Sequence, residues 1–182
     1  MQSARRLFVS VAAAAMLAAC ADEAPLSPAS QNALPAQFAF GVCDNLDVEA
    51  GHELAFHTYA RGVQVYRWNG TSWSFVGPVA TLYADANEKA VVGTHYSGPT
   101  WESVSGSKVV AALVDRCTRD ANSIPWLLLK KVSSTGPGVF QGVTFIQRMN
   151  TVGGNAPANA GNFIGEVVEI PYTAEYFFYA AQ

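Results

Sequence analysis

Hydrophobic and polar residues alternate along most of the second half of this chain and much of the first. The clearest alternation covers residues 63–68 and 71–76, with Asn69 and Gly70 between them. A period of two is typical of half-buried strands, and Asn-Gly between two such stretches favours a tight hairpin turn. With an upstream strand over residues 53–60, the pattern predicts a three-stranded meander.

The remaining strands are predicted from shorter stretches, because no window of eleven or more residues shows a convincing helical face. Residues 126–132 are almost continuously apolar, which indicates a strand buried on both faces. Pro171 is expected at a bulge or a break in the last stretch, which would form one or two strands. Eight or more short strands in one domain predict an all-β fold, either an antiparallel β-sandwich or a closed barrel. The further strands are expected over residues 91–96, 101–104, 108–114, 126–132, 143–149 and 167–179.

The N-terminus carries the pattern of an export signal. Two arginines precede an apolar run that ends in Leu17-Ala18-Ala19-Cys20, the kind of sequence that a lipoprotein signal peptidase cleaves before a lipidated cysteine. The run has about half of the twenty apolar residues that a transmembrane helix needs. We therefore expect a lipoprotein signal peptide over residues 1–19 and lipidation of Cys20.

A tether and a single domain would remain after cleavage. Residues 20–36 are rich in Ala, Pro, Ser and Asn and are predicted to form a flexible tether, followed by one β domain over residues 37–182. The lipid on Cys20 would hold the protein to the cell envelope. Since Ala21 rather than Asp follows this cysteine, we expect the periplasmic face of the outer membrane if the host is Gram-negative.

The charge of the chain restricts its partners. The full sequence has 11 basic and 14 acidic residues, and cleavage removes two of the basic ones, which leaves a net charge of about −5. No basic cluster exists beyond Lys130 and Lys131, so nucleic acid is not an expected partner. The expected partners are the membrane, through the lipid anchor, and a polysaccharide or an envelope protein.

The two other cysteines, Cys43 and Cys117, form an even pair in an exported protein. A disulfide is expected in such an oxidising compartment. Two buried free thiols are the alternative.

Chemically capable side chains are densest over residues 95–102. His95 and Glu102 are candidates for an acid and a base, and Tyr96 and Trp101 for a platform that stacks on a sugar or an aromatic ligand. The structural alternative is that this Gly-Pro turn closes one end of the fold and that His95 hydrogen-bonds a turn carbonyl.

Arg148 stands in an otherwise apolar stretch and requires a partner if it is buried. Glu102 and Glu175 are the expected partners, and the carboxylate of a ligand is the alternative. We also expect the turn over residues 95–102 and the loop over residues 151–154 to line one pocket with Arg148. The candidate ligand-binding residues are His95, Tyr96, Trp101, Glu102 and Arg148.

No metal or cofactor is expected. The three histidines and the cysteines lack zinc-ligand spacing, and no strand, glycine-rich turn and helix unit is present to hold a dinucleotide. The leading hypothesis is a binding or interaction module of the cell envelope. The alternative is an envelope enzyme that acts on a small or carbohydrate substrate through His95, Glu102 and Arg148.

Seven blocks of sequence, in order, resemble the family called domain of unknown function 3455, which is found in exported bacterial and fungal proteins. The resemblance extends from about Leu54 to Tyr179 and implies an exported single domain, without an activity. Where the family usually has two cysteines, this chain has Trp68 and Ala160, so a bridge between those positions is absent here. The blocks are GVQVY (62–66), GPVATL (77–82), HYSGPTWE (95–102), IPWLLL (124–129), VTFIQR (143–148), TVGG (151–154) and PYTAEY (171–176).

Overall fold

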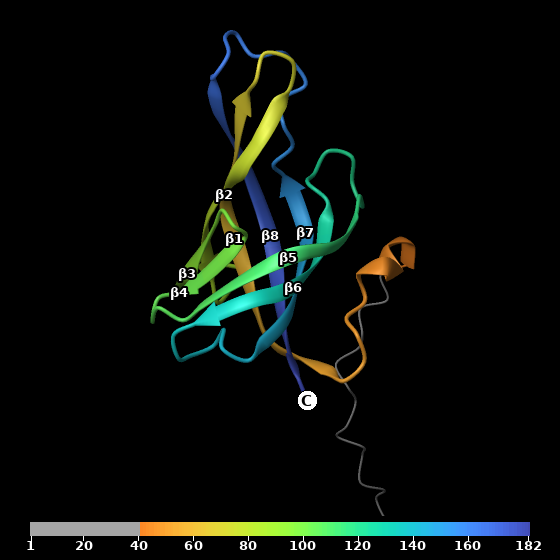
Figure 1. The fold of residues 1–182 in the computed structure, drawn as a ribbon, viewed down its shortest axis with the longest axis vertical. Coiled ribbons are helices and arrows are strands. Elements are labelled where there is room, and N and C mark those ends of the chain that lie inside the picture. The colour runs from red at the N-terminus through yellow and green to blue at the C-terminus, as the bar shows by residue number, and fades with distance from the viewer. Residues whose placement is uncertain (1–40) are drawn as a thin grey trace, which may run out of the picture. The chain divides into compact units, whose positions relative to one another are not determined.

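The computed structural model describes residues 41–182, so the expected signal peptide, the lipidated Cys20 and the tether lie outside the described residues. Eight antiparallel strands each pair with the next one, and the last pairs with the first, which closes the sheet into a barrel (Figure 1). The predicted all-β fold is confirmed, and the barrel is the correct one of the two predicted architectures. The strands are β1 (His52–Trp68), β2 (Trp73–Tyr83), β3 (Val91–Tyr96), β4 (Thr100–Ser103), β5 (Lys108–Cys117), β6 (Trp126–Thr135), β7 (Val143–Gly153) and β8 (Val167–Ala181).

Strands β1 and β8 are longer than the sequence pattern predicts. Strand β1 runs through Gly62 without interruption, and this glycine is required because a Cβ there would lie 2.1 Å from the Val79 carbonyl oxygen. Strand β8 likewise continues through Pro171, although a bulge or a break was expected there. The pairing of β7 with β8 ends at Tyr172, so the missing N–H of the proline falls at the end of that ladder.

The connection between β1 and β2 also differs from the predicted tight turn. It contains the four residues 69–72, and Trp68 pairs with Trp73 across it. The Asn69 side-chain oxygen accepts hydrogen bonds from the backbone N–H groups of Thr71 and Ser72, at 2.9 and 2.8 Å. An asparagine that bonds to its own loop in this way stabilises a longer turn than the Asn-Gly pair alone suggests.

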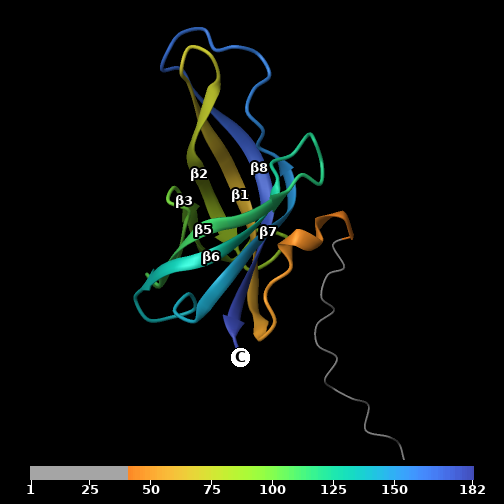
Figure 2. The ribbon, with the colours of Figure 1, turned by 45° about the vertical axis from the view of Figure 1, so that its right-hand side comes forward.

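Strand β6 is buried on both faces near its start, as its apolar sequence predicts. Leu129 packs with the aromatic residues inside the barrel, whereas Leu128 packs on the outside against the segment that precedes β1. In this segment a short 3₁₀ helix, Gly41–Leu46, lies beside the barrel wall (Figure 2). The outer cluster consists of Cys43, Leu46, Leu128, Phe145, Met149 and Phe177.

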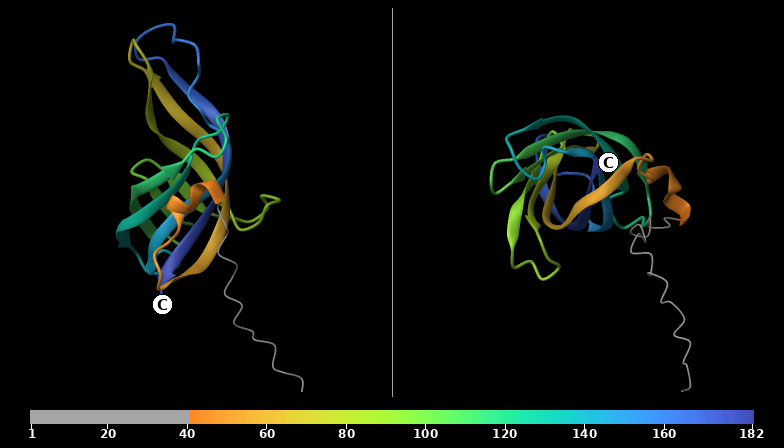
Figure 3. Two further views of the ribbon diagram at one scale, coloured as in Figure 1. Left: turned by 90° about the vertical axis from the view of Figure 1, so that its right-hand side faces the viewer. Right: turned by 90° about the horizontal axis from the view of Figure 1, so that it is seen from below.

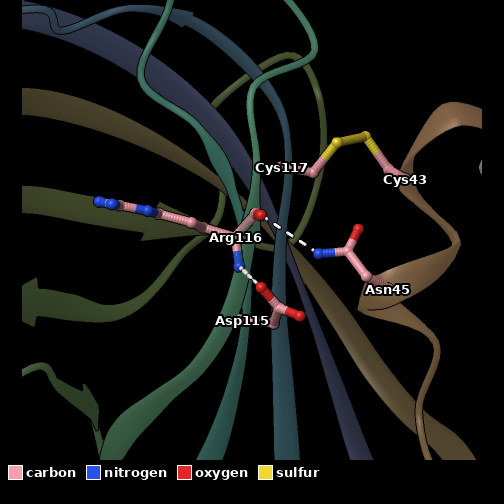
Figure 4. Close-up of a disulfide and its surroundings, with 5 residues drawn as sticks. All are labelled: Cys43, Asn45, Asp115, Arg116 and Cys117. Atoms are coloured by element: carbon pink, nitrogen blue, oxygen red, sulfur yellow. Dashed lines mark hydrogen bonds between the residues drawn. A yellow bond between two sulfur atoms is a disulfide. The ribbon is translucent and has the colours of Figure 1, made fainter.

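A disulfide between Cys43 and Cys117 attaches the same segment to the end of β5 (Figure 4). The two Cα atoms are 5.6 Å apart, within the usual range for such bonds, so the expected bridge is confirmed. Asn45 adds a hydrogen bond of 3.2 Å from its side chain to the Arg116 carbonyl beside the bridge. Within residues 41–182, no helix has the length and apolar character needed to cross a membrane.

The barrel wall is incomplete on one side because β3 and β4 are shorter than the strands β2 and β5 that flank them. Pairing of β2 with β3 stops at Val79, yet β2 continues to Trp73, and pairing of β4 with β5 stops at Val110, yet β5 continues to Cys117. The end-on view in Figure 3 shows the strands arranged as a ring. Beyond the turn that joins β3 to β4, β2 and β5 therefore have no strand between them. We call this gap in the wall the notch.

Candidate functional site

A cavity of about 170 Å³ lies at this notch and extends into the barrel. The side chains that mark its opening are exposed and apolar: Phe75 is 56%, Val76 48% and Leu113 54% exposed. The side chains that mark its inner part are buried. The lining residues are Phe75–Pro78, His95, Ser97–Pro99, Trp101, Leu113, Leu127, Leu129, Arg148 and Tyr176.

His95 is positioned by the short β3–β4 hairpin, in which it pairs with Trp101. Its Nδ1 lies 2.9 Å from the carbonyl oxygen of Thr100. A carbonyl only accepts, so Nδ1 carries the proton and Nε2 presents a lone pair. Burial lowers the pKa of His95, the hydrogen bond to Thr100 opposes this effect and the charge of Arg148 adds to it, so that the pKa is about 3. The imidazole is therefore neutral at physiological pH.

Three aromatic rings form the inner wall of the cavity. His95 and Trp101 are stacked with their centroids 4.3 Å apart, and Tyr176 meets both rings edge-on, at 5.0 and 5.4 Å. The indole Nε1–H of Trp101 is buried and has no hydrogen-bond partner, and the buried hydroxyl of Tyr176 lies beside Tyr172 and Arg148. Burial raises the pKa of Tyr176, so its hydroxyl keeps its proton and remains a donor.

Arg148 lies in β7 opposite Tyr176 of β8 and Leu127 of β6, with 9% of its surface exposed. Its Nε and Nη2 donate to the carbonyl oxygen of Pro125, at 3.2 and 2.8 Å. The expectation that Glu102 or Glu175 pairs with Arg148 is wrong. Among residues 41–182, no carboxylate forms an ion pair with this guanidinium.

Both expected carboxylates are engaged elsewhere. Glu102 accepts a 2.7 Å hydrogen bond from Tyr96 and forms a 3.2 Å ion pair with Lys108, and these two bonds hold the pKa of its carboxyl below the usual value. Glu175 pairs with His57 at 2.9 Å and accepts a hydrogen bond from Asn150. The alternation of β3 and β4 thus separates Tyr96 and Glu102 from the cavity, so the predicted site residues do not form one group.

The loop over residues 151–154 does not line the cavity either, contrary to expectation. Its Gly154 carbonyl accepts a 2.7 Å hydrogen bond from Tyr66, and Thr151 donates to the Ile124 carbonyl at 2.6 Å. The loop is therefore bound to the barrel interior. Of the predicted site residues, the cavity contains His95, Trp101 and Arg148.

Tyr176 and the apolar residues of the opening were not among the site residues predicted from the sequence. Tyr176 alternates with Tyr172, Ala174 and Phe178 along the inward face of β8, and this period of two is visible in the sequence. Its position beside Arg148 depends on the register of β7 and β8, which no local pattern reveals. Within the described part of the chain, no group of three or more His, Cys, Asp or Glu side chains is placed to hold a metal ion.

One known protein family matches the sequence of this chain. Residues 49–180 match the family described as "Protein of unknown function (DUF3455)". The chain belongs to this family. The match covers all eight strands except the last residue of β8. Comparison with curated proteins and with solved structures found no match.

Proposed function

We propose that this DUF3455 protein is a lipid-anchored binding protein of the cell envelope whose barrel takes up a small organic molecule at the notch. The lipobox-like end of the signal sequence supports the location. The cavity supports the activity, since ligand sites are concave, mostly apolar and provided with a few converging polar groups.

The observation that carries this proposal is an opening lined by exposed apolar side chains that leads to buried polar ones, Arg148 among them. Arg148 lines the cavity with 9% of its surface exposed and has no carboxylate partner among residues 41–182, although a buried charge without a counter-ion is costly. A molecule with acceptor atoms would remove this cost. The cavity also has an opening to solvent between β2 and β5.

Binding fits this geometry better than acid–base catalysis does. The alternative hypothesis requires His95 and a carboxylate within hydrogen-bond reach of each other. Glu102 instead bonds to Tyr96 and Lys108, and a histidine with a pKa of about 3 is a poor base at neutral pH.

A screen of small neutral and charged molecules by ligand-observed NMR and thermal shift tests the proposal. A ligand at a hundred times its dissociation constant adds about 2.7 kcal/mol of stability, which corresponds to roughly 5–10 °C in Tm for a domain of this size. Leu127→Trp should abolish binding, because Leu127 lines the cavity and a larger ring would fill it.

Val104→Trp is the matched control, because Val104 is exposed and does not line the cavity. It should bind as the wild type does. Equal binding by both variants, or no binding of any molecule to the wild type, would refute the proposal.

A second candidate, an interaction surface for an envelope protein, is favoured by the exposed apolar residues Phe163 and Ile164 in the loop between β7 and β8. This loop packs beside the β1–β2 turn, where Trp73 donates to the Asn159 carbonyl at 2.9 Å. Photo-crosslinking from position 163 in intact cells should capture one envelope protein, and Ile164→Ser should weaken that product. Absence of a specific product excludes this candidate.

A further inference from the structure

Arg148 is a buried cation with unused donors. The guanidinium has five N–H groups, of which Nε and one on Nη2 are directed to the Pro125 carbonyl. Both N–H groups of Nη1 and the second on Nη2 remain, and the Tyr176 hydroxyl lies beside the guanidinium. Nη1 and Nη2 form the end of the guanidinium that binds a carboxylate through two parallel hydrogen bonds.

The groups around Arg148 do not compensate its charge. The guanidinium influences the pKa values of Tyr66, His95, Tyr172 and Tyr176, so these four side chains lie within its field. Burial raises the pKa of each tyrosine, and His95 is neutral. None of the four is an anion near neutral pH, and a buried charge without a counter-ion is costly.

The rest of the cavity suits an apolar and flat group. The stacked rings of His95 and Trp101 present an aromatic wall, and exposed apolar side chains, Phe75 among them, surround the opening. A volume of about 170 Å³ is slightly larger than the engineered cavity of about 150 Å³ that binds benzene in another protein. One aromatic ring with a small polar substituent therefore fits.

We infer that the cavity binds a small organic monoanion in which a carboxylate is attached to a flat apolar ring, with the carboxylate on Arg148 and the ring against the aromatic wall. This inference rests on the proposed binding function and specifies its ligand class. The N–H groups of Arg148 that do not bond to Pro125 are the donors for the carboxylate oxygens. These donors thus match a ligand whose charged end only accepts hydrogen bonds.

Isothermal titration calorimetry on the mature, disulfide-bonded protein tests the ligand class with three probes. Benzoate has the ring and the charge, benzamide has the same shape without the charge, and acetate has the charge without the ring. We expect benzoate to bind at least tenfold more tightly than either of the others.

Substitutions then assign the charge recognition to one residue. Arg148→Gln should weaken benzoate binding at least tenfold and benzamide binding much less, and Arg148→Lys should give an intermediate result because it keeps the charge without the fork. Arg67→Gln is the control, since Arg67 is exposed and does not line the cavity. It should bind benzoate as the wild type does.

The outcomes separate this inference from the proposed function. The inference of a monoanionic ligand is overturned if benzamide binds as tightly as benzoate, or if Arg148→Gln binds benzoate as the wild type does. Loss of benzamide binding in Leu127→Trp would still support a ligand site in the cavity. If the wild type binds none of the three probes, the ligand class is wrong. The proposed function then depends on the wider screen and its cavity-filling variant. If Arg148→Gln fails to fold, Arg148→Lys and the benzoate–benzamide comparison decide the result.

Discussion

His95 should make this barrel sensitive to acid. Burial lowers the pKa of His95 in the folded protein to about 3, whereas a histidine in an unfolded chain has a pKa of about 6.5. Between these pH values the unfolded state binds a proton that the folded state does not bind. The free energy of unfolding should therefore be unaffected by His95 above pH 6.5 and fall as the pH decreases from there towards 3.

The size of the effect follows from the two pKa values. Each pH unit in this interval corresponds to about 1.4 kcal/mol. At pH 4.5, about two units below the pKa in the unfolded chain, His95 should therefore lower the free energy of unfolding by roughly 2.7 kcal/mol. This is a substantial part of the 5–15 kcal/mol that stabilises a typical domain.

Urea denaturation of the wild type and His95→Asn at pH 7.0 and pH 4.5 measures this contribution. Asparagine cannot titrate, but its amide can still donate to the Thr100 carbonyl that His95 Nδ1 contacts. The variant should be less stable at pH 7.0, because the stack on Trp101 is lost. Between pH 7.0 and pH 4.5, the variant should lose less free energy of unfolding than the wild type, by about 2.7 kcal/mol.

Comparing losses removes the contribution of the carboxylates, which both proteins share. His52→Asn, at the start of β1 and outside the cavity, is the matched control and should retain the wild-type loss. Equal losses for the wild type and His95→Asn would show that His95 is not a neutral, buried group and would refute the reasoning.

Three further predictions concern stability and export. Replacing Cys43 and Cys117 by Ser should lower the free energy of unfolding by about 4 kcal/mol, since the bridge closes a loop with a sequence separation of 74; a urea titration in which both proteins unfold at the same midpoint contradicts this. Gly93→Ala should cost at least about 2 kcal/mol by overpacking, because its Cβ would lie 2.3 Å from a β4 carbonyl oxygen, whereas Gly142→Ala, with no atom within 4 Å, should change Tm little. Metabolic labelling with palmitate should mark the wild type and not Cys20→Ser; unlabelled wild-type protein in the soluble periplasm would exclude the lipid anchor.

Local patterns in the sequence were sufficient to predict the strands, the closed or layered all-β fold and the disulfide. Alternation predicts which residues of a strand share a face of the sheet. The almost continuous apolar stretch at the start of β6 correctly indicated burial on both faces, with Leu129 inside the barrel and Leu128 outside it. The predicted separation of residues 53–60 from 63–68 and the interruption at Pro171 were wrong. Strand β2 approaches Gly62 closely, and the β7 ladder ends beside Pro171, so β1 and β8 run through both residues.

The site was less predictable because it depends on strand register. Treating residues 95–102 as one loop grouped His95 with Glu102, whereas the hairpin pairs His95 with Trp101 and Thr94 with Glu102 on the opposite face. Pairing across the turn at Ser97–Pro99 would have revealed this separation. The neighbours of Arg148 come from β6 and β8, and their alignment with β7 is a property of the whole barrel.

The disulfide determines how a mechanical load enters the barrel. Tension that reaches Cys43 from the preceding chain passes through the sulfur atoms to the end of β5 as well as along the backbone to β1. Without the bridge, such a pull would be resisted only by the packing of the 3₁₀ segment on the outer cluster, and after that by β1. With the bridge, the same pull must also displace β5, so the force is distributed between two strands on different parts of the wall.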